Sequence, residues 1–141
     1  MAATRIVLWR LYHRHVVRSV ILVSDDPDLF QSASDVLLKD PRFQASVSNL
    51  HCSEGEAPLT NIYPVVSQAA EWRDWAGTAS EGATPNPRTM SNVLIESRSA
   101  GCIAEIGVRL AKGLASPAWF IDSADVAWPV GRVDPRRIAL A

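Results

Sequence analysis

The sequence predicts an α+β protein, a two-layer sandwich in which two helices pack on one face of a mixed β-sheet. Two observations lead to this prediction. An apolar, β-branched run followed by an amphipathic helical pattern occurs twice, over residues 20–40 and 92–115, and a further strand pattern follows each helix. The chain has 141 residues, of which 48% are hydrophobic, so it is long enough for one domain with a core and too short to expect two.

The first unit begins with residues 16–24, VVRSVILVS, a nearly continuous apolar run that is typical of a strand covered on both faces. Asp26 followed by Pro27 predicts a helix N-cap with proline at the first helical position. Apolar residues then recur at helical spacing until Asp40 and Pro41, where we expect the helix to end.

The next segment predicts two further stretches of sheet. Residues 42–52 alternate well enough to be a second strand. Pro58 and Pro64 bracket a short apolar run, and because proline is confined to the edges and ends of strands, residues 59–63 are expected to form an edge strand at best.

Residues 76–91 are rich in Gly, Ser, Thr and Pro and predict a long surface loop. Just before this loop, Trp72 and Trp75 are spaced three apart, as on one turn of a helix. Tryptophan has a large area to bury and is enriched among interface anchors, so both are candidate binding residues.

The second unit predicts a strand, a Ser99 cap and a helix that places Glu105 and Arg109 four residues apart on its solvent side. We expect residues 117–129 to be a strand and residues 136–141 a last short one. The two units can be aligned with an offset of 73 residues, at which Lys39 falls on Lys112. The low identity leaves open whether this reflects duplication or only shared apolar patterning.

Two strand–helix–strand units predict a ferredoxin-like arrangement or a related one. Whether the two helix starts lie at the same edge of the sheet depends on the number of strands between them. If residues 59–63 form a strand, the starts share an edge; if not, they lie at opposite edges.

The N-terminal segment differs from the rest in charge. Residues 1–24 contain four arginines and no acid, whereas the whole chain is nearly balanced, with 14 Lys+Arg against 15 Asp+Glu. We interpret residues 1–15 as a loose basic leader and residues 16–141 as a single domain; the alternatives are an Arg-rich targeting segment or a helix with Arg10, Arg14 and Arg18 on one face. The overall balance argues against a dedicated nucleic-acid binder.

The cysteine count, the lengths of the apolar runs and the motifs bear on where the protein is located and on whether it binds a cofactor. The two cysteines, Cys52 and Cys102, cannot form a disulfide framework, which is compatible with a reducing cytoplasm. No window approaches the roughly 18 apolar residues of a membrane span, so we expect a soluble, cytoplasmic protein without membrane contact. Cofactor-binding motifs are absent, and no zinc site is expected from two cysteines and three poorly spaced histidines.

Polar residues at the two helix starts are the first candidate ligand-binding site. With both starts at one edge, Asp25 and Asp26 would face Arg98 and Ser99 across a groove that could bind an anion or a cation. The alternative is that Asp26 is a helix cap, Asp25 is solvated and Arg98 is a surface partner.

Two further clusters contain residue types that can take part in catalysis. His51 and Cys52 are adjacent and would point to opposite faces of a strand, which disfavours a nucleophile–base pair. Asp122 lies among apolar residues, so it is either a functional carboxylate or the start of a turn at residues 122–125 whose side chain bonds local backbone.

These features predict a small binding or protein-interaction module that holds a small ligand or docks a partner protein, for example as an antidote or adaptor. The alternative is a small hydrolytic or acid–base enzyme that uses an acidic groove at the helix starts, or Asp122 with His51. Self-association through an exposed strand edge is a third alternative. A protein partner or a second copy is expected in preference to nucleic acid.

Overall fold

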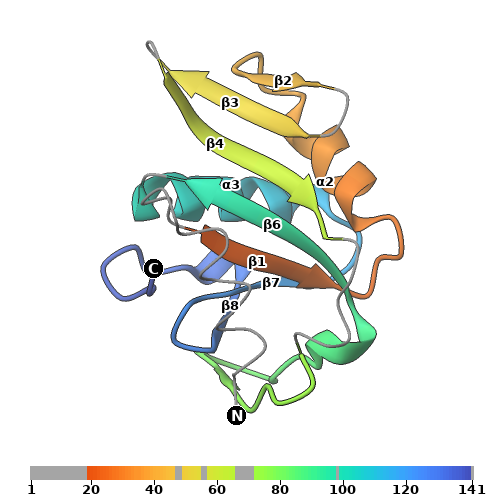
Figure 1. Ribbon diagram of the computed structural model, residues 1–141, viewed down its shortest axis with the longest axis vertical. Coiled ribbons are helices and arrows are strands. Elements are labelled where there is room, and N and C mark those ends of the chain that lie inside the picture. The colour runs from red at the N-terminus through yellow and green to blue at the C-terminus, as the bar shows by residue number, and fades with distance from the viewer. Residues whose placement is uncertain (1–18, 47–48, 55–56, 66–71, 98, 141) are drawn as a thin grey trace.

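The computed structural model describes residues 19–46, 49–54, 57–65, 72–97 and 99–140, so the basic segment 1–15 lies outside the described residues. These residues form one eight-stranded sheet with helices packed against it (Figure 1). The strands are β1 (Ser19–Ser24), β2 (Phe43–Ala45), β3 (Leu50–Glu54), β4 (Ala57–Pro64), β5 (Thr78–Ala79), β6 (Ser91–Ser97), β7 (Ala118–Ile121) and β8 (Val126–Pro129). The helices are α2 (Leu29–Leu37) and α3 (Ala100–Gly113), with two 3₁₀ turns, η1 (Pro87–Thr89) and η2 (Val130–Arg132).

The strands run in the order β2-β3-β4-β6-β1-β7-β8-β5. All neighbours are antiparallel except β5 and β8, which are parallel. The α+β class and the mixed sheet are therefore confirmed. The two-layer sandwich and its ferredoxin-like arrangement are not confirmed, because the sheet is larger and its strand order differs.

The segment after α2 differs most from the sequence prediction. The single strand expected over residues 42–52 is two antiparallel strands, β2 and β3, with Phe43 opposite Cys52. The expected edge strand at residues 59–63 lies inside the sheet, within β4, between β3 and β6. Its prolines fall at or near the strand ends, where a missing N–H disturbs the hydrogen-bond ladder least.

The central strand β1 is covered on both faces, as its continuous apolar run predicts. Val20 and Leu22 belong to the core cluster that includes the buried faces of α2 and α3. Ile21 and Val23 belong to a second cluster on the opposite face. All four side chains are buried, so both helices pack on one face of the sheet and other residues cover the other face.

Local side-chain hydrogen bonds shape the starts of the two helices. Ser99 is the N-cap of α3, as predicted, and its Oγ accepts a hydrogen bond from the Cys102 N–H at 3.2 Å. Helix α2 begins at Leu29, two residues later than predicted, with Asp28 as the N-cap. Asp26 instead bonds the Asp28 N–H through its Oδ1 at 2.8 Å, a turn that delays the helix.

The C-terminal region also departs from the prediction. Residues 118–129 form a hairpin of β7 and β8 that turns at Asp125, whose φ is 64°. The last strand expected over residues 136–141 is absent from its described part, residues 136–140. Ile138 is buried there instead, because its segment packs against the core without joining the sheet. Neither described helix is long and apolar enough to cross a membrane.

Candidate functional site

The two helix starts lie at opposite ends of the central strands. β1 and β6 are antiparallel neighbours, with Ser24 at the end of β1 opposite Ser91 at the beginning of β6. Asp25 and Asp26 follow β1 at one end of this pair, whereas Ser99 follows β6 at the other. The shared groove is therefore not formed. The reason is that two antiparallel strands, β2 and β3, occur where one strand was expected. The additional strand reverses the direction in which the chain enters β6.

Of the four residues expected to line this groove, three are solvated or bond their own helix start, and one lies outside the residues that the structure describes. Asp25 is exposed, and Asp26 makes the turn described above. Ser99 caps α3. Arg98 is outside the described residues.

Asp122 is buried and fully engaged with neighbouring donors. Its exposed fraction is 1%. Its Oδ1 accepts hydrogen bonds from the Ala124 N–H at 2.9 Å and the Val126 N–H at 3.0 Å. Its Oδ2 accepts from Trp128 Nε1 at 2.9 Å and from the Ala139 N–H at 3.0 Å. The carboxylate thus fastens the β7–β8 turn and the C-terminal segment, as the local-turn alternative predicts.

Trp72 and Trp75 are core residues of the second face of the sheet. Their exposed fractions are 1% and 6%, and their rings meet edge to face with centroids 6.3 Å apart. Trp72 Nε1 donates a hydrogen bond to Asn92 Oδ1. They pack on the β1 residues Ile21 and Val23, so in this conformation neither is an exposed binding anchor.

A concave feature that none of these residues lines lies at the end of α3. It is an open groove of about 720 Å³. Its walls come from the last turn of α3, the start of β7, the end of β8 with η2, and residues 81–83 after β5. No sequence pattern predicts this groove, because its lining combines three separate segments, residues 81–83, 111–119 and 129–132.

The groove is lined mainly by small and apolar side chains. The groove is open because small residues line it, namely Ala111, Ala115 and Gly131. The half-buried indole of Trp119 forms part of its wall. At its rim, Arg132 Nε and Glu81 Oε1 are 3.1 Å apart, and both side chains are at least half exposed. These two are the titratable residues of the groove. The arrangement suits an apolar ligand with one charged group.

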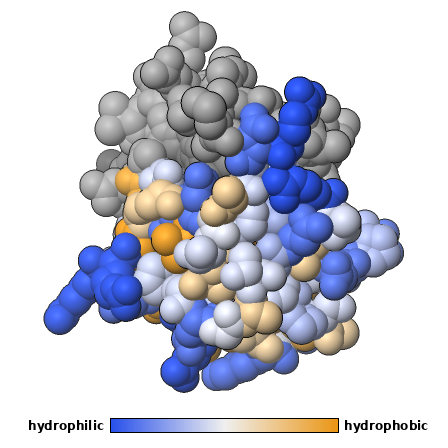
Figure 2. All heavy atoms as spheres, turned by 90° about the horizontal axis from the view of Figure 1, so that it is seen from below, coloured by the Kyte–Doolittle hydropathy of each residue, from blue (hydrophilic) through white to orange (hydrophobic). Residues whose placement is uncertain are grey.

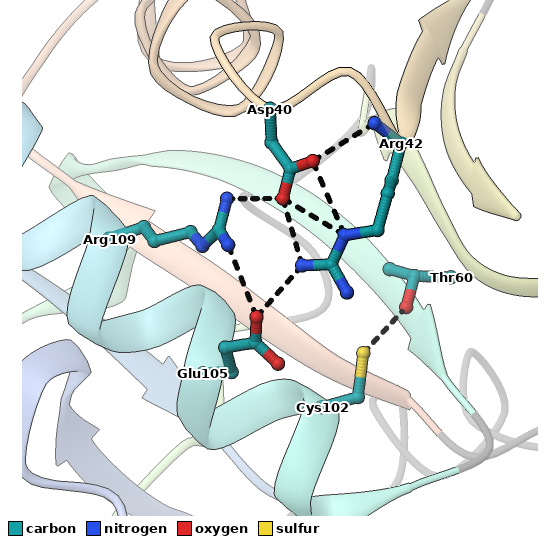
Figure 3. Close-up of polar contacts among 6 residues, drawn as sticks. All are labelled: Asp40, Arg42, Thr60, Cys102, Glu105 and Arg109. Atoms are coloured by element: carbon teal, nitrogen blue, oxygen red, sulfur yellow. Dashed lines mark hydrogen bonds and ion pairs between the residues drawn. The ribbon is translucent and has the colours of Figure 1, made fainter. Parts of the chain in front are cut away.

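A second cluster, Asp40, Arg42, Glu105 and Arg109, joins the loop after α2 to α3 (Figure 3). Arg42 donates to Asp40 Oδ2 from Nη2 at 2.8 Å and to Glu105 Oε1 at 2.9 Å. Arg109 bonds both carboxylates as well, with Nη2 3.2 Å from Glu105 Oε1. The predicted pair of Glu105 and Arg109 is confirmed as one part of this four-residue network.

The network determines the charge of Asp40. Hydrogen bonds from the Arg42 side chain and its N–H, followed by Arg109, hold the pKa of the Asp40 carboxyl far below its ordinary value. Hydrogen bonds to Asp40 and then to Glu105 raise the pKa of the Arg42 guanidinium. Asp40 is therefore a permanent carboxylate at neutral pH, an anchor for guanidinium groups and unsuited to proton transfer.

Replacing Asp40 by asparagine should make the free energy of unfolding depend less on pH in the acid range. A carboxyl whose pKa is lower in the folded state stabilises the fold above the unfolded-state pKa, and this contribution is lost as pH falls through the folded-state pKa. In the wild type, stability should therefore decline from about pH 5 downward, and Asp40→Asn should decline less. Urea unfolding between pH 2 and 7 measures this. Asp28→Asn controls for the loss of one negative charge, and an unchanged slope in Asp40→Asn would contradict the expectation.

A small cavity of about 200 Å³ lies beside this network and is lined by both cysteines. Cys52 is buried in β3, and Cys102 is half-buried near the start of α3. Cys102 Sγ is 3.2 Å from Thr60 Oγ1 (Figure 3). Among the described residues, no three of His, Cys, Asp and Glu are grouped to bind a metal ion.

Comparison with other proteins adds no family. No protein-family model matches the chain, and no curated protein or solved structure is significantly similar to it. Function must therefore be inferred from the geometry of the groove and the charged cluster.

Proposed function

We propose that this protein is a small ligand-binding module whose ligand occupies the groove at the end of α3. The observation that supports this most is the combination of size and lining. A groove of about 720 Å³ with apolar walls and one ion pair at the rim matches sites for small organic molecules, which span roughly 300–1,000 Å³ and are mostly apolar. The ligand we propose has an aromatic or aliphatic body and a single charged group.

The half-buried Trp119 gives the groove a flat aromatic wall. An aromatic or aliphatic ligand stacked there would cover apolar area that is now in contact with water. The charged group of the ligand would form an ion pair with either Glu81 or Arg132, and the bond between these two residues would break. Because this pair is exposed, opening it costs little.

The surface favours a small ligand over a broad docking interface. Among the described residues, only Leu38 and Val108 are large hydrophobic side chains that are exposed. The face seen from below is mostly hydrophilic or intermediate, with one small strongly hydrophobic group (Figure 2). Protein interfaces usually need a larger apolar centre with aromatic anchors, and the two tryptophans expected in that role are buried.

The acid–base enzyme alternative has less support. An enzyme needs several polar groups within reach of one pocket. The aspartates at the start of α2 do not meet the start of α3, and Asp122 is engaged by four donors. His51 lies on β3, four positions away from β7 in the strand order, so it does not meet Asp122.

Titration with 8-anilinonaphthalene-1-sulfonate, a fluorescent probe with an apolar body and one negative charge, tests the proposal. We expect saturable binding of one probe per chain to the folded protein. Ala115→Trp should weaken binding at least tenfold, because Ala115 is an exposed residue of the groove wall and the indole would fill the groove. Val108→Trp is the matched control, since Val108 is exposed on α3 outside the groove.

Two results would reject the proposal: unsaturable binding by the wild type, or equal binding by both tryptophan variants. Thermal unfolding of each variant, measured without probe, shows whether the added indole has disturbed the fold. A screen of small aromatic carboxylates and amines by thermal shift then identifies the preferred charge of the ligand, because a ligand at a hundred times its Kd adds about 2.7 kcal/mol to stability.

A further inference from the structure

The ends of α2 and α3 lie side by side and form a second pocket, of about 660 Å³. Gly113, the last residue of α3, allows this close approach: a Cβ at Gly113 would lie 2.7 Å from Val36 Cγ2 on α2. Lys39 follows α2, and Lys112 lies in the last turn of α3. The two lysines that the sequence alignment of the two units matches are thus brought to one pocket.

The composition of this pocket is unusual for the chain. Lys39 and Lys112 are the only two lysines among its 141 residues, and both line the pocket together with Arg42 and Arg109. Asp40 is the one carboxylate in the lining. Four cations, two from the segment between α2 and β2 and two from α3, therefore line the pocket together with a single acid.

The arginines are oriented by bonds that leave some of their N–H groups unused. Arg42 binds Asp40 and Glu105 through Nε and Nη2, and Arg109 binds them through Nη1 and Nη2. Arg42 Nη1 and Arg109 Nε take no part in these bonds to Asp40 and Glu105, and neither nitrogen has another partner among the described residues. A guanidinium held in place keeps its donor geometry, so less freedom is lost when a ligand binds.

The positive charge exceeds the negative charge nearby. Each helix C-terminus contributes roughly half a negative charge, which offsets some of the lysine charge. Asp40 and Glu105 offset two more cations. One unit of positive charge remains, carried largely by the exposed lysines, and this excess favours an anion.

We propose that this pocket binds a phosphate group, either inorganic phosphate or the phosphate of a small phosphate monoester. A tetrahedral dianion can accept hydrogen bonds from several directions at once, which suits a pocket lined by two lysines and two arginines. The pocket is larger than phosphate alone, so it has room for the body of a monoester. This site is separate from the groove of the proposed function: it contains Lys112 and Gly113, and the groove contains Ala111 and Leu114.

Lysine-selective ¹³C and ¹⁵N labelling gives a direct test, because both lysine side-chain signals report on this pocket. We expect the Cε–Hε signals of Lys39 and Lys112 to move together and saturate with one Kd when sodium phosphate replaces sodium chloride at constant ionic strength. Titration with glycerol 3-phosphate in the same way distinguishes the two sources. Tighter binding of the ester assigns the pocket to monoesters, and equal binding assigns it to inorganic phosphate.

Variants that each lose one positive charge distinguish phosphate binding in this pocket from a general effect of the protein's charge. Lys39→Gln and Lys112→Gln should each weaken binding at least fivefold, whereas Arg136→Gln, which removes one exposed positive charge elsewhere, should leave Kd within twofold. In each lysine variant the remaining lysine signal reports binding. Signals that do not move, that shift without saturation, or that respond equally in all three variants would overturn the proposal.

Discussion

Replacing Asp122 by alanine should lower the free energy of unfolding by about 3 kcal/mol, because one buried donor and three partly buried donors would lose their acceptor at once. The carboxylate accepts from three backbone N–H groups and from Trp128 Nε1, and its side chain is almost inaccessible to water. An unpaired buried donor costs roughly 1–3 kcal/mol, and only the donors nearest the surface can turn to water instead. The β7–β8 turn and the segment containing Ala139 should both loosen.

Denaturant unfolding followed by tryptophan fluorescence measures this effect. Asp122→Asn should be less damaging than Asp122→Ala, since the amide keeps one acceptor oxygen. Asp28→Ala is the control, because Asp28 is exposed and makes no side-chain cap bond within the described residues; its effect should stay within about 0.5 kcal/mol. A change below about 1 kcal/mol in Asp122→Ala would show that the carboxylate does not stabilise the turn.

Gly107→Ala should also cost about 3 kcal/mol, the upper part of the usual range for overpacking a core. Gly107 lies on the buried face of α3, where the helix meets η2. An added Cβ would lie 2.0 Å from the Val130 carbonyl oxygen and 2.9 Å from Phe120 Cε2. Backbone atoms cannot rotate away as a side chain can, so α3 would have to shift from η2 and the groove beside it would change shape.

Gly101→Ala, in the same helix, should have the opposite sign. Gly101 is exposed, and a Cβ there would meet only Ser99 Oγ, at the ordinary distance of 3.4 Å. Alanine is the better helix former, so the substitution should stabilise the protein by about 0.5 kcal/mol. Thermal and urea unfolding of the two variants side by side make the comparison; equal effects would mean that α3 does not depend on close contact at Gly107.

Much of the local structure could be predicted from the sequence. The buried central strand, both helices and the Ser99 cap follow from apolar periodicity and capping residues, which act over a few neighbours. Two errors concern turns of the chain. The turn at Asp26 delays α2, and the chain between Phe43 and Cys52 reverses although its alternating pattern is continuous.

The candidate sites were less predictable, because each is assembled from distant segments. The sequence alignment matched Lys39 with Lys112, but only the packing of α2 on α3 brings them to one pocket. Small residues such as Ala115 and Gly131 have no distinctive pattern in the sequence, yet they open the groove. Conversely, Trp72 and Trp75 look like binding residues until the sheet face that they cover is known.

Residue spacing and hydrogen bonds between near neighbours are enough to predict the α+β class, the approximate positions of β1, α2, β6 and α3, and the cap at Ser99. They do not predict that the helix starts lie at opposite ends of the central strands, that the two tryptophans are core residues, or that the two lysines line one pocket. These features depend on long-range packing, because one additional reversal of the chain, at β2 and β3, changes the direction of every later strand, and no local interaction encodes that direction.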